Sequence, residues 1–236
     1  AHDSLAVAMA FLAAYNARAQ GVRHYVIQMM HNTPPSTSPA MDLAKMLAKL
    51  ELIKPLEGPK FTTFREVRAG ITSLPLDEHK AKGHMAASAI YAMALKPHIL
   101  HVVGYSEAHR VVNARVLIES CQIARGAVEL ALQGAPDPTH DAAVHARTYH
   151  LVREAKILLE GIRALTPNSA DAWADPAALT RAIKTGLLDT PHFRGNPHLC
   201  GQIRTACING GWEAINTETR HPIGERERLE ALGVAV

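Results

Sequence analysis

Polar side chains are concentrated in three loops, residues 31–39, 69–77 and 104–112, each of which follows a predicted strand. In a sheet of parallel strands, ligand-binding groups come from the loops at the carboxyl ends of the strands. These loops and the strand ends beside them offer amide, hydroxyl, carboxylate, imidazole and guanidinium groups: Asn32, Thr33, Arg68, Thr72, Ser73, Tyr105, Ser106, Glu107, His109 and Arg110. The pattern predicts a small-molecule site at one edge of a sheet, although surface loops are polar in any protein.

Glu107 is the loop residue with the most definite chemistry. It follows the strand-like run ILHVVGY, residues 99–105, by two positions. A carboxylate there can accept hydrogen bonds from the hydroxyls of a ribose or from an amino group. The alternatives are a solvated loop glutamate or an ion pair with Arg110.

The segment DEHKAKG, from Asp77 to Gly83, is close to the Asp-x-His-x-x-Gly motif by which some cobalamin domains supply a histidine to cobalt. Asp77 and His79 fit that motif, but the glycine comes one position too late, and no glycine-rich loop for the nucleotide tail follows. We therefore interpret the segment as the start of a helix. Asp77 is then the cap or a first-turn acid, and Lys80 and Lys82 are solvated.

No metal site is predicted. His140, His145 and His150 recur every five residues, which spreads them around a helix instead of aligning them as a zinc pair. The three cysteines are widely spaced without a CxxC pair, so neither a disulfide framework nor a zinc knuckle is expected. Cys121 falls within an amphipathic helix and is expected to be a small core residue.

The elements that would position the loops alternate between strands and helices. The predicted strands are residues 24–30, 61–68 and 99–105. The predicted helices are residues 4–20, 40–53, 77–95 and 113–132. This alternation is typical of an α/β protein with a parallel sheet, either a barrel or a doubly wound fold.

The pattern changes after Gly134. Residues 140–165 and 175–186 are expected to be helical, and the charged tail GERERLEALG forms a short helix. Residues 187–211 are rich in Gly, Pro, His and Asn, and no regular structure is assigned to them.

The composition is that of an ordinary globular protein, with 236 residues, 47% hydrophobic, 20% charged and a net charge of +3. No basic run is interleaved with aromatic residues, so nucleic-acid binding is not expected. The apolar N-terminal stretch lacks a basic leader and is interrupted by polar residues, which predicts a buried helix and neither a signal peptide nor a membrane span. We expect a cytoplasmic protein. The absence of an initiating Met indicates a fragment or a processed chain.

Several stretches, taken in order, resemble the C-terminal half of the large, barrel subunit of adenosylcobalamin-dependent glutamate mutase, also called methylaspartate mutase. The stretches that carry the resemblance are GITSLPLDEHKAKG (70–83), ILHVVGYSEA (99–108), AIKTGLLDTPHFRGNP (182–197) and ERERLEAL (225–232). No single motif establishes the resemblance. The order of the four stretches along the chain is the stronger signal. The NTPP loop, residues 32–35, is also similar to the large subunits of lysine and ornithine aminomutases, which use pyridoxal phosphate as well.

The resemblance implies the C-terminal part of a (β/α)8 barrel in residues 1–133, with a mostly helical extension in residues 134–236 that packs on it. It implies an isomerase that acts on a small-molecule substrate, with adenosylcobalamin held mainly by a separate small subunit or domain and capped by the barrel. Glu107 falls where the family has a glutamate that contacts the adenosyl ribose. Residues near the adenosine would be Gly70, Ile71, Thr72 and Tyr105. No catalytic residue is assigned.

Two departures from the family follow from the residues. The family places a lysine shortly before its glutamate, whereas this chain has Val103-Gly104-Tyr105, so His109 or Arg110 would have to supply the cation. The arginines that bind substrate carboxylates lie in the first barrel half, so the remaining half must come in cis or in trans. An oligomer is expected, because a partial barrel exposes strand edges. Alternatives are a non-catalytic scaffold or an aminomutase subunit whose Schiff-base lysine comes from elsewhere.

Overall fold

The computed structural model describes residues 1–236, which divide into two compact units. The sheet unit comprises residues 26–46 and 63–145, and the helical unit comprises residues 1–25, 47–62 and 146–236. None of the helices is both long enough and apolar enough to cross a membrane.

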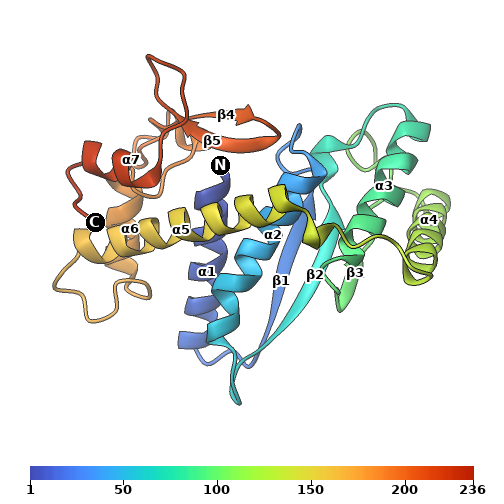
Figure 1. Cartoon of the computed structure of the whole chain (residues 1–236), viewed down its shortest axis with the longest axis horizontal. Coiled ribbons are helices and arrows are strands. Elements are labelled where there is room, and N and C mark those ends of the chain that lie inside the picture. The colour runs from blue at the N-terminus through green and yellow to red at the C-terminus, as the bar shows by residue number, and fades with distance from the viewer. The chain divides into compact units, whose positions relative to one another are not determined.

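A parallel three-stranded sheet forms the centre of the sheet unit (Figure 1). Its strands, in spatial and sequence order, are β1 (His24–His31), β2 (Thr62–Ala69) and β3 (Ile99–His101). β2 and β3 pair in parallel, with Glu66 opposite Ile99 and Arg68 opposite His101. The predicted α/β class with a parallel sheet is confirmed, and these three strands do not close into a barrel.

β3 is shorter than the predicted strand 99–105, because it ends at His101. Beyond this point, the side chains of Val103 and Tyr105 turn into the core. The backbone N–H of Glu107 then donates to the carbonyl of Gly104 at 2.9 Å, which closes a turn. The β-branched run is therefore apolar because it enters the core, and only its first part pairs with a neighbouring strand.

Two helices that follow the strands pack against each other in the sheet unit (Figure 1). These are α3 (Glu78–Met93) and α4 (Ala114–Leu132). Asp77 caps α3 by accepting a hydrogen bond from the Lys80 N–H at 3.0 Å, which confirms the predicted helix start. Asn113 caps α4 in the same way. The remaining helices of this unit are the first turns of α2 (Pro39–Ile53), η2 (Ile71–Ser73), η3 (Pro138–His140) and the start of α5 (Ala142–Leu165).

The predicted core position of Cys121 is wrong, because its side chain is exposed. The buried face of α4 consists of small residues at helical spacing: Val116, Ser120, Ala124 and Ala127. Cys121 follows Ser120 by one residue, which turns its side chain about 100° away from that face.

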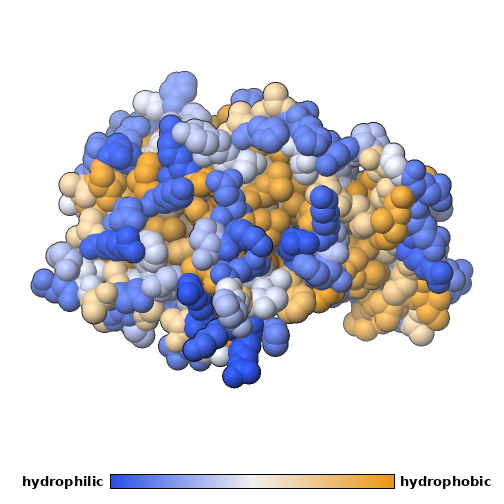
Figure 2. Space-filling model, turned by 60° about the horizontal axis from the view of Figure 1, so that its bottom comes forward, coloured by the Kyte–Doolittle hydropathy of each residue, from blue (hydrophilic) through white to orange (hydrophobic).

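An apolar groove of about 680 Å³ lies at the carboxyl ends of α3 and α4. Its lining includes Ile90, Tyr91, Met93 and Leu132, and the side chain of Leu132 is 72% exposed. Hydrophobic residues gather on this part of the surface in Figure 2, at the lower right. Surfaces of this kind are typical of contacts with another chain or segment.

The helical unit is built around α1 (Asp3–Ala19) and the long part of α5. Its other elements are the end of α2, η1 (Lys54–Leu56), α6 (Pro176–Lys184), η4 (Pro191–Phe193), β4 (Arg204–Ile208), β5 (Gly211–Ile215) and α7 (Glu225–Ala231). The rings of Phe11 and Tyr15 in α1 meet Trp173 edge-on, with centroids 5.1 and 5.4 Å from it. Such aromatic contacts add to the burial that holds α1 in place.

β4 and β5 form an antiparallel hairpin. The first of these strands lies within residues 187–211, for which no regular structure is predicted. Its turn is Asn209–Gly210, and both residues have positive φ, 50° and 81°. Asn-Gly is the dipeptide that two-residue hairpin turns favour, because it tolerates this conformation. That dipeptide, between the runs RTACI and GWEAI, is the signal that would have predicted the hairpin.

Asp189 organises the loop between α6 and β4. Its side chain is 2% exposed and accepts four backbone hydrogen bonds. One oxygen takes the N–H groups of Thr190 (2.9 Å) and Gly201 (2.7 Å), and the other takes those of Gln202 (2.8 Å) and Ile203 (2.9 Å). A carboxylate can satisfy four donors in this way, so the loop folds around one side chain.

Glu225, the first residue of α7, connects this C-terminal helix to the start of α1. Its buried carboxylate lies 2.5 Å from His2 Nε2 and accepts from Ser4 Oγ (2.6 Å) and Arg228 Nε (2.8 Å). Burial by itself raises the pKa of this carboxyl, but the bonds and charges of His2 and Arg228, together with Ser4, lower it to about 2. Glu225 therefore stays ionised inside the protein and fixes α1 to α7.

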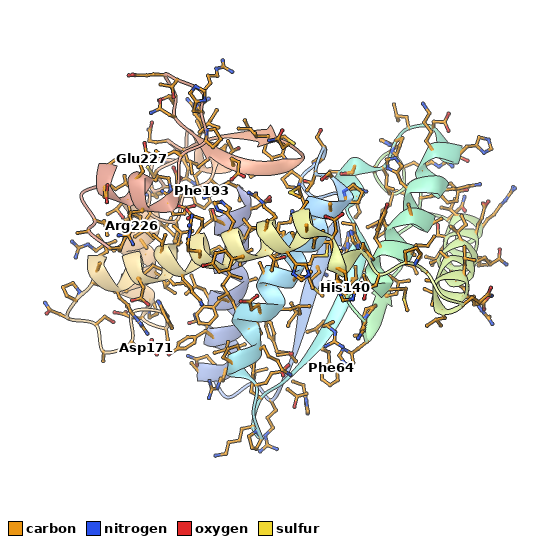
Figure 3. All side chains as sticks on the ribbon, viewed as in Figure 1. Phe64, His140, Asp171, Phe193, Arg226 and Glu227 are labelled. Atoms are coloured by element: carbon orange, nitrogen blue, oxygen red, sulfur yellow. The ribbon has the colours of Figure 1, made fainter.

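We predict that Asp189→Asn destabilises the protein by about 3 kcal/mol, measured as the free energy of unfolding in urea. The asparagine amide would point its own N–H groups at two of the four backbone donors, which then lose their acceptor. Asp171, on the loop between α5 and α6 (Figure 3), is the matched control. It is exposed and accepts one bond from the Tyr15 hydroxyl, so Asp171→Asn should change stability by less than about 1 kcal/mol. Equal effects of the two variants would contradict the role given to Asp189.

Candidate functional site

The three predicted loops meet at the carboxyl edge of the sheet. The N–H of Gly70, which follows β2, donates to the carbonyl of His31 at the end of β1 (2.7 Å). The Ser73 hydroxyl donates to the carbonyl of Asn32. His109, in the loop after β3, places Nε2 3.0 Å from the carbonyl of Leu74. The second loop therefore contacts both of the others.

Gly70 lies so close to the first loop that no side chain fits there. A Cβ atom on Gly70 would lie 2.0 Å from Thr33 Oγ1 and 2.7 Å from the backbone oxygen of His31. Both distances are well inside van der Waals contact. The glycine is therefore needed for the packing of two loops, whatever the site binds.

A buried polar group that sequence reasoning missed holds the end of β1. It consists of His31, Asp42 and Lys45, which are 2%, 0% and 3% exposed. Lys45 Nζ lies 2.9 Å from an Asp42 carboxylate oxygen and donates to the carbonyl of Thr33 at 2.7 Å. The other oxygen of Asp42 accepts the backbone N–H of Asn32. The ion pair thus anchors the first loop to the start of α2.

In the sequence, Asp42 stands near the start of the predicted helix 40–53, where an acidic residue is favourable without being buried. The only sequence signal of the ion pair is the spacing of Asp42 and Lys45, three residues apart on a helix that follows a strand. That spacing is common on exposed helix faces. It would not have predicted burial.

His31 is neutral at physiological pH. Burial, aided by the nearby charge of Lys45, lowers the pKa of its imidazole to about 4. Its Nε2 is buried and has no hydrogen-bond partner in the protein. The ring of Tyr91 lies beside it, with centroids 6.4 Å apart. A neutral imidazole with one unused nitrogen can donate or accept one hydrogen bond, according to its tautomer.

Tyr105 belongs to the core beneath the third loop. Its ring is 4% exposed and packs with Leu74, Met85 and Val116. Its hydroxyl donates to Glu119 Oε2 at 3.0 Å. As placed, Tyr105 supports the loop from below and presents neither its hydroxyl nor its ring to a ligand.

Lys82, predicted to be solvated, is instead part of this arrangement. Its ammonium lies 2.5 Å from a Glu119 oxygen and 4.6 Å from the centroid of the Tyr105 ring. The hydrogen bond to Glu119 raises the pKa of Lys82, and the same bond lowers the pKa of the Glu119 carboxyl. Burial, followed by the bond to Glu119, raises the pKa of the Tyr105 phenol. The prediction failed because Lys82 faces α4, which the sequence of α3 alone does not show.

Glu107 is exposed, and the protein fixes its position. One carboxylate oxygen accepts the backbone N–H of Gly104 at 3.0 Å, and the other is not bonded to any residue. The predicted alternative, an ion pair with Arg110, does not form, because Arg110 pairs with Glu78. His109 contacts the carbonyl of Leu74, so neither His109 nor Arg110 pairs with Glu107.

The remaining predicted residues differ in access. Ile71 is half-buried and packs against the core cluster below the loop. Thr72, the central residue of η2, is exposed. Gly70 is buried. Of the five residues predicted to lie near a cofactor, Glu107 and Thr72 therefore present side chains at the surface.

The carboxyl edge offers a carboxylate with one free oxygen, a hydroxyl, and backbone held rigidly by a buried ion pair. This set can accept hydrogen bonds from a diol or an amine. No group of three His, Cys, Asp or Glu side chains in the protein is placed to hold a metal ion. Comparison of the chain with protein-family models and with curated proteins finds no match.

We predict that His31 makes stability depend on pH. Between pH 6.5 and about 4, the unfolded chain takes up a proton at His31 that the folded protein excludes. The free energy of unfolding should therefore fall as the pH is lowered through this window, by up to about 3 kcal/mol from this residue. Urea unfolding at pH 7.5, 6.0 and 4.5 measures the slope. His31→Leu should flatten it, whereas His84→Leu, at an exposed position of α3, should leave it unchanged.

We predict opposite effects of alanine at two kinds of glycine. Gly70→Ala forces the first two loops apart and should destabilise the protein by about 2 kcal/mol. Gly83→Ala and Gly126→Ala, inside α3 and α4 with open space around each, should stabilise it by about 0.5–1 kcal/mol. Thermal and urea unfolding provide the measurement. A neutral Gly70→Ala would show that the loops are not packed as described.

Proposed function

We propose that this chain is part of the barrel subunit of a coenzyme B12-dependent carbon-skeleton mutase of the glutamate mutase type. The observation that carries the proposal is Glu107, an exposed carboxylate in the loop after β3, which accepts the Gly104 N–H and stands at the position that the family resemblance assigns to ribose recognition. The carboxyl edge is also where parallel α/β enzymes bind their ligands.

The proposal also includes the fold, a (β/α)8 barrel. The order β1–α2–β2–α3–β3–α4, with consecutive strands adjacent, is the repeat from which a (β/α)8 barrel is built. In this interpretation the sheet is the C-terminal part of a barrel, and residues 134–236 are its helical extension. The remaining strands would come from another segment or another chain. The exposed strand β3 and the apolar groove beside it support association of this kind.

The residues fit an adenosyl group in part. Glu107 has a free oxygen for the two ribose hydroxyls, and the exposed Thr72 hydroxyl is in the neighbouring loop. Gly70, Ile71 and Tyr105 would act indirectly, because each is committed to packing that holds these loops in place. Adenosylcobalamin, when bound, supplies the radical chemistry of a carbon-skeleton rearrangement. The contribution of this chain would be to bind and orient the adenosyl group.

The cobalamin itself would be held mainly by a small partner subunit or domain, and the groups that bind a substrate carboxylate would come from the missing barrel half. The aminomutase alternative, with pyridoxal phosphate, gains no support from Lys45. Although this lysine has a distinctive setting, it is buried and held by Asp42 and the carbonyl of Thr33. A Schiff-base lysine must be accessible to the cofactor.

We predict that adenosylcobalamin raises the melting temperature of the protein more than hydroxocobalamin does. The two corrinoids differ in the upper ligand of cobalt, so the difference reports recognition of the adenosyl group. Glu107→Gln should remove most of that difference, because an amide oxygen still accepts from Gly104 but carries no charge toward the ribose. A thermal shift assay with each corrinoid, alone and with a cobalamin-binding subunit, measures this.

Glu129→Gln is the matched control, since Glu129 is an exposed glutamate on α4 that pairs only with Arg125. It should leave the response to adenosylcobalamin intact. Equal responses to the two corrinoids, or none to either in the presence of the partner subunit, would overturn the proposal and favour the scaffold alternative.

A further inference from the structure

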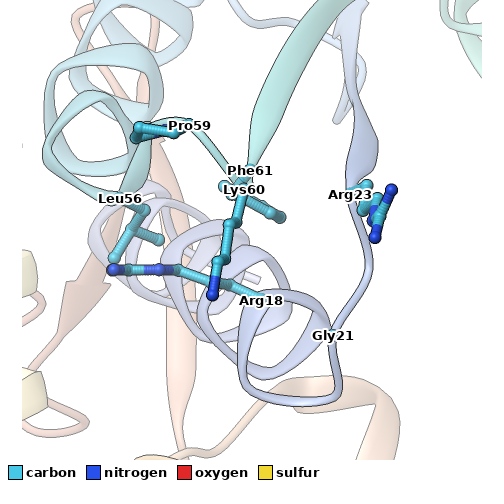
Figure 4. Close-up of a pocket in the computed structure, with 8 residues that line it drawn as sticks. Arg18, Gly21, Arg23, Leu56, Pro59, Lys60 and Phe61 are labelled. Atoms are coloured by element: carbon cyan, nitrogen blue, oxygen red, sulfur yellow. The ribbon is translucent and has the colours of Figure 1, made fainter.

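A pocket in the helical unit, which shares no residue with the loops of the carboxyl edge, is lined by three basic residues and no acidic one. Its volume is about 590 Å³, within the range of small-molecule sites. The basic residues are Arg18, Arg23 and Lys60 (Figure 4). The other lining residues are Gly21, Leu56, Gly58, Pro59 and Phe61.

A rigid turn places Arg18 and Arg23 at the rim. The end of α1 is a Schellman motif, in which the Val22 N–H donates to the carbonyl of Ala17 (3.0 Å) and the Gly21 N–H donates to that of Arg18 (3.0 Å). Gly21 adopts a φ of 80°, which a glycine tolerates without strain. The reversed chain then enters β1 through Arg23.

A second tight turn presents Lys60. Gly58 and Phe61 exchange both backbone hydrogen bonds, at 3.0 and 3.1 Å, so Pro59 and Lys60 form a two-residue loop. Figure 4 shows the Lys60 side chain extending from this turn toward that of Arg18, with Leu56 on one side and Arg23, on its strand, on the other. In Figure 2 the region of this turn is strongly hydrophilic, at the lower edge of the view.

The three cations have no counter-ion in the protein. None of them forms an ion pair with a carboxylate, and all three are exposed. A basic residue in the last turn of a helix is favourable by itself, which accounts for Arg18. That effect does not account for two more cations on separate turns around one pocket. Like charges brought together without a partner repel one another, and a bound anion would relieve this repulsion.

The floor of the pocket is apolar. Leu56 and Phe61 are 6% and 2% exposed, and the Phe61 ring stacks on Tyr25 with centroids 6.0 Å apart. Cations at the rim and hydrophobic side chains below match a ligand that carries phosphate at one end and an uncharged organic part at the other. A concave shape of this size also fits a small molecule better than the flat contact expected of a protein partner.

We propose that this pocket binds a phosphorylated small molecule, with Arg18 and Lys60 holding the phosphate and Leu56 and Phe61 contacting the organic part. Arg23 adds charge at the rim. The site involves neither Glu107 nor the carboxyl edge, so the proposal does not depend on the function proposed above. The phosphate chemistry is shared by inorganic pyrophosphate and by nucleotides, and the experiment separates the two.

The test is isothermal titration calorimetry of the whole chain with pyrophosphate, ATP and adenosine. ATP and pyrophosphate should bind, adenosine should not, and the affinity should fall as salt is added. Tighter binding of ATP than of pyrophosphate would show that the organic part is recognised, and equal binding would assign the site to phosphate alone. The double variant Arg18→Gln/Lys60→Gln should weaken binding at least about tenfold, the loss expected for two charged contacts.

Arg181→Gln/Lys184→Gln is the control, because it removes the same charges from the last turn of α6, where both residues are exposed. It should leave binding unchanged. Equal weakening by the two double variants would show attraction by net charge only and would overturn the proposal. Absence of binding at millimolar pyrophosphate and ATP would also overturn it. So would binding of a polyglutamate peptide in preference to both, which would indicate a protein partner.

Discussion

The carboxyl edge of the sheet depends on one buried ion pair, between Asp42 and Lys45. These two side chains bind the backbone of the first loop at Asn32 and Thr33, so movement of the loop would cost each buried charge a hydrogen bond. Removing one partner of such a pair is costly, although the pair itself adds little net stability. Its role is therefore positional. The second loop packs on the first through Gly70, and the third loop contacts the second.

The same pair determines the chemistry of its surroundings. The ammonium of Lys45 helps to keep the buried imidazole of His31 uncharged. The carboxyl edge of the sheet thus has a buried polar group that holds the first loop and an exposed carboxylate, that of Glu107, in the third loop. A rigid support of this kind lowers the entropy that a binding side chain loses when a ligand arrives. Such an arrangement suits the recognition of a ligand whose hydroxyl groups have a defined geometry.

Local signals in the sequence predicted the elements well, whereas contacts between elements were out of reach. Asp77 and the alanine-rich sequence of residues 78–93 act within one helix, so both could be recognised from the sequence. Lys82 and Cys121 were misplaced because the choice of helix face depends on which neighbour covers it. Asp42 and Lys45 were missed for a related reason: charged residues are assumed to be solvated, and burial becomes visible only when their partners are known. The three loops could be placed at one edge because loops that follow parallel strands lie at the same edge of the sheet.

The network around Glu225 has a consequence for the order in which the protein folds during synthesis. Most polar partners of the N-terminal part of α1, including Glu225 itself and Arg147, come from the second half of the chain. Contacts that span more than 200 residues form late, because the intervening chain must be made and its ends brought together. The sheet unit, by contrast, has all its residues available once residue 145 has left the ribosome. Helix α1 is translated before the sheet unit and is nevertheless among the last elements to acquire its native surroundings, so its apolar face needs protection until then.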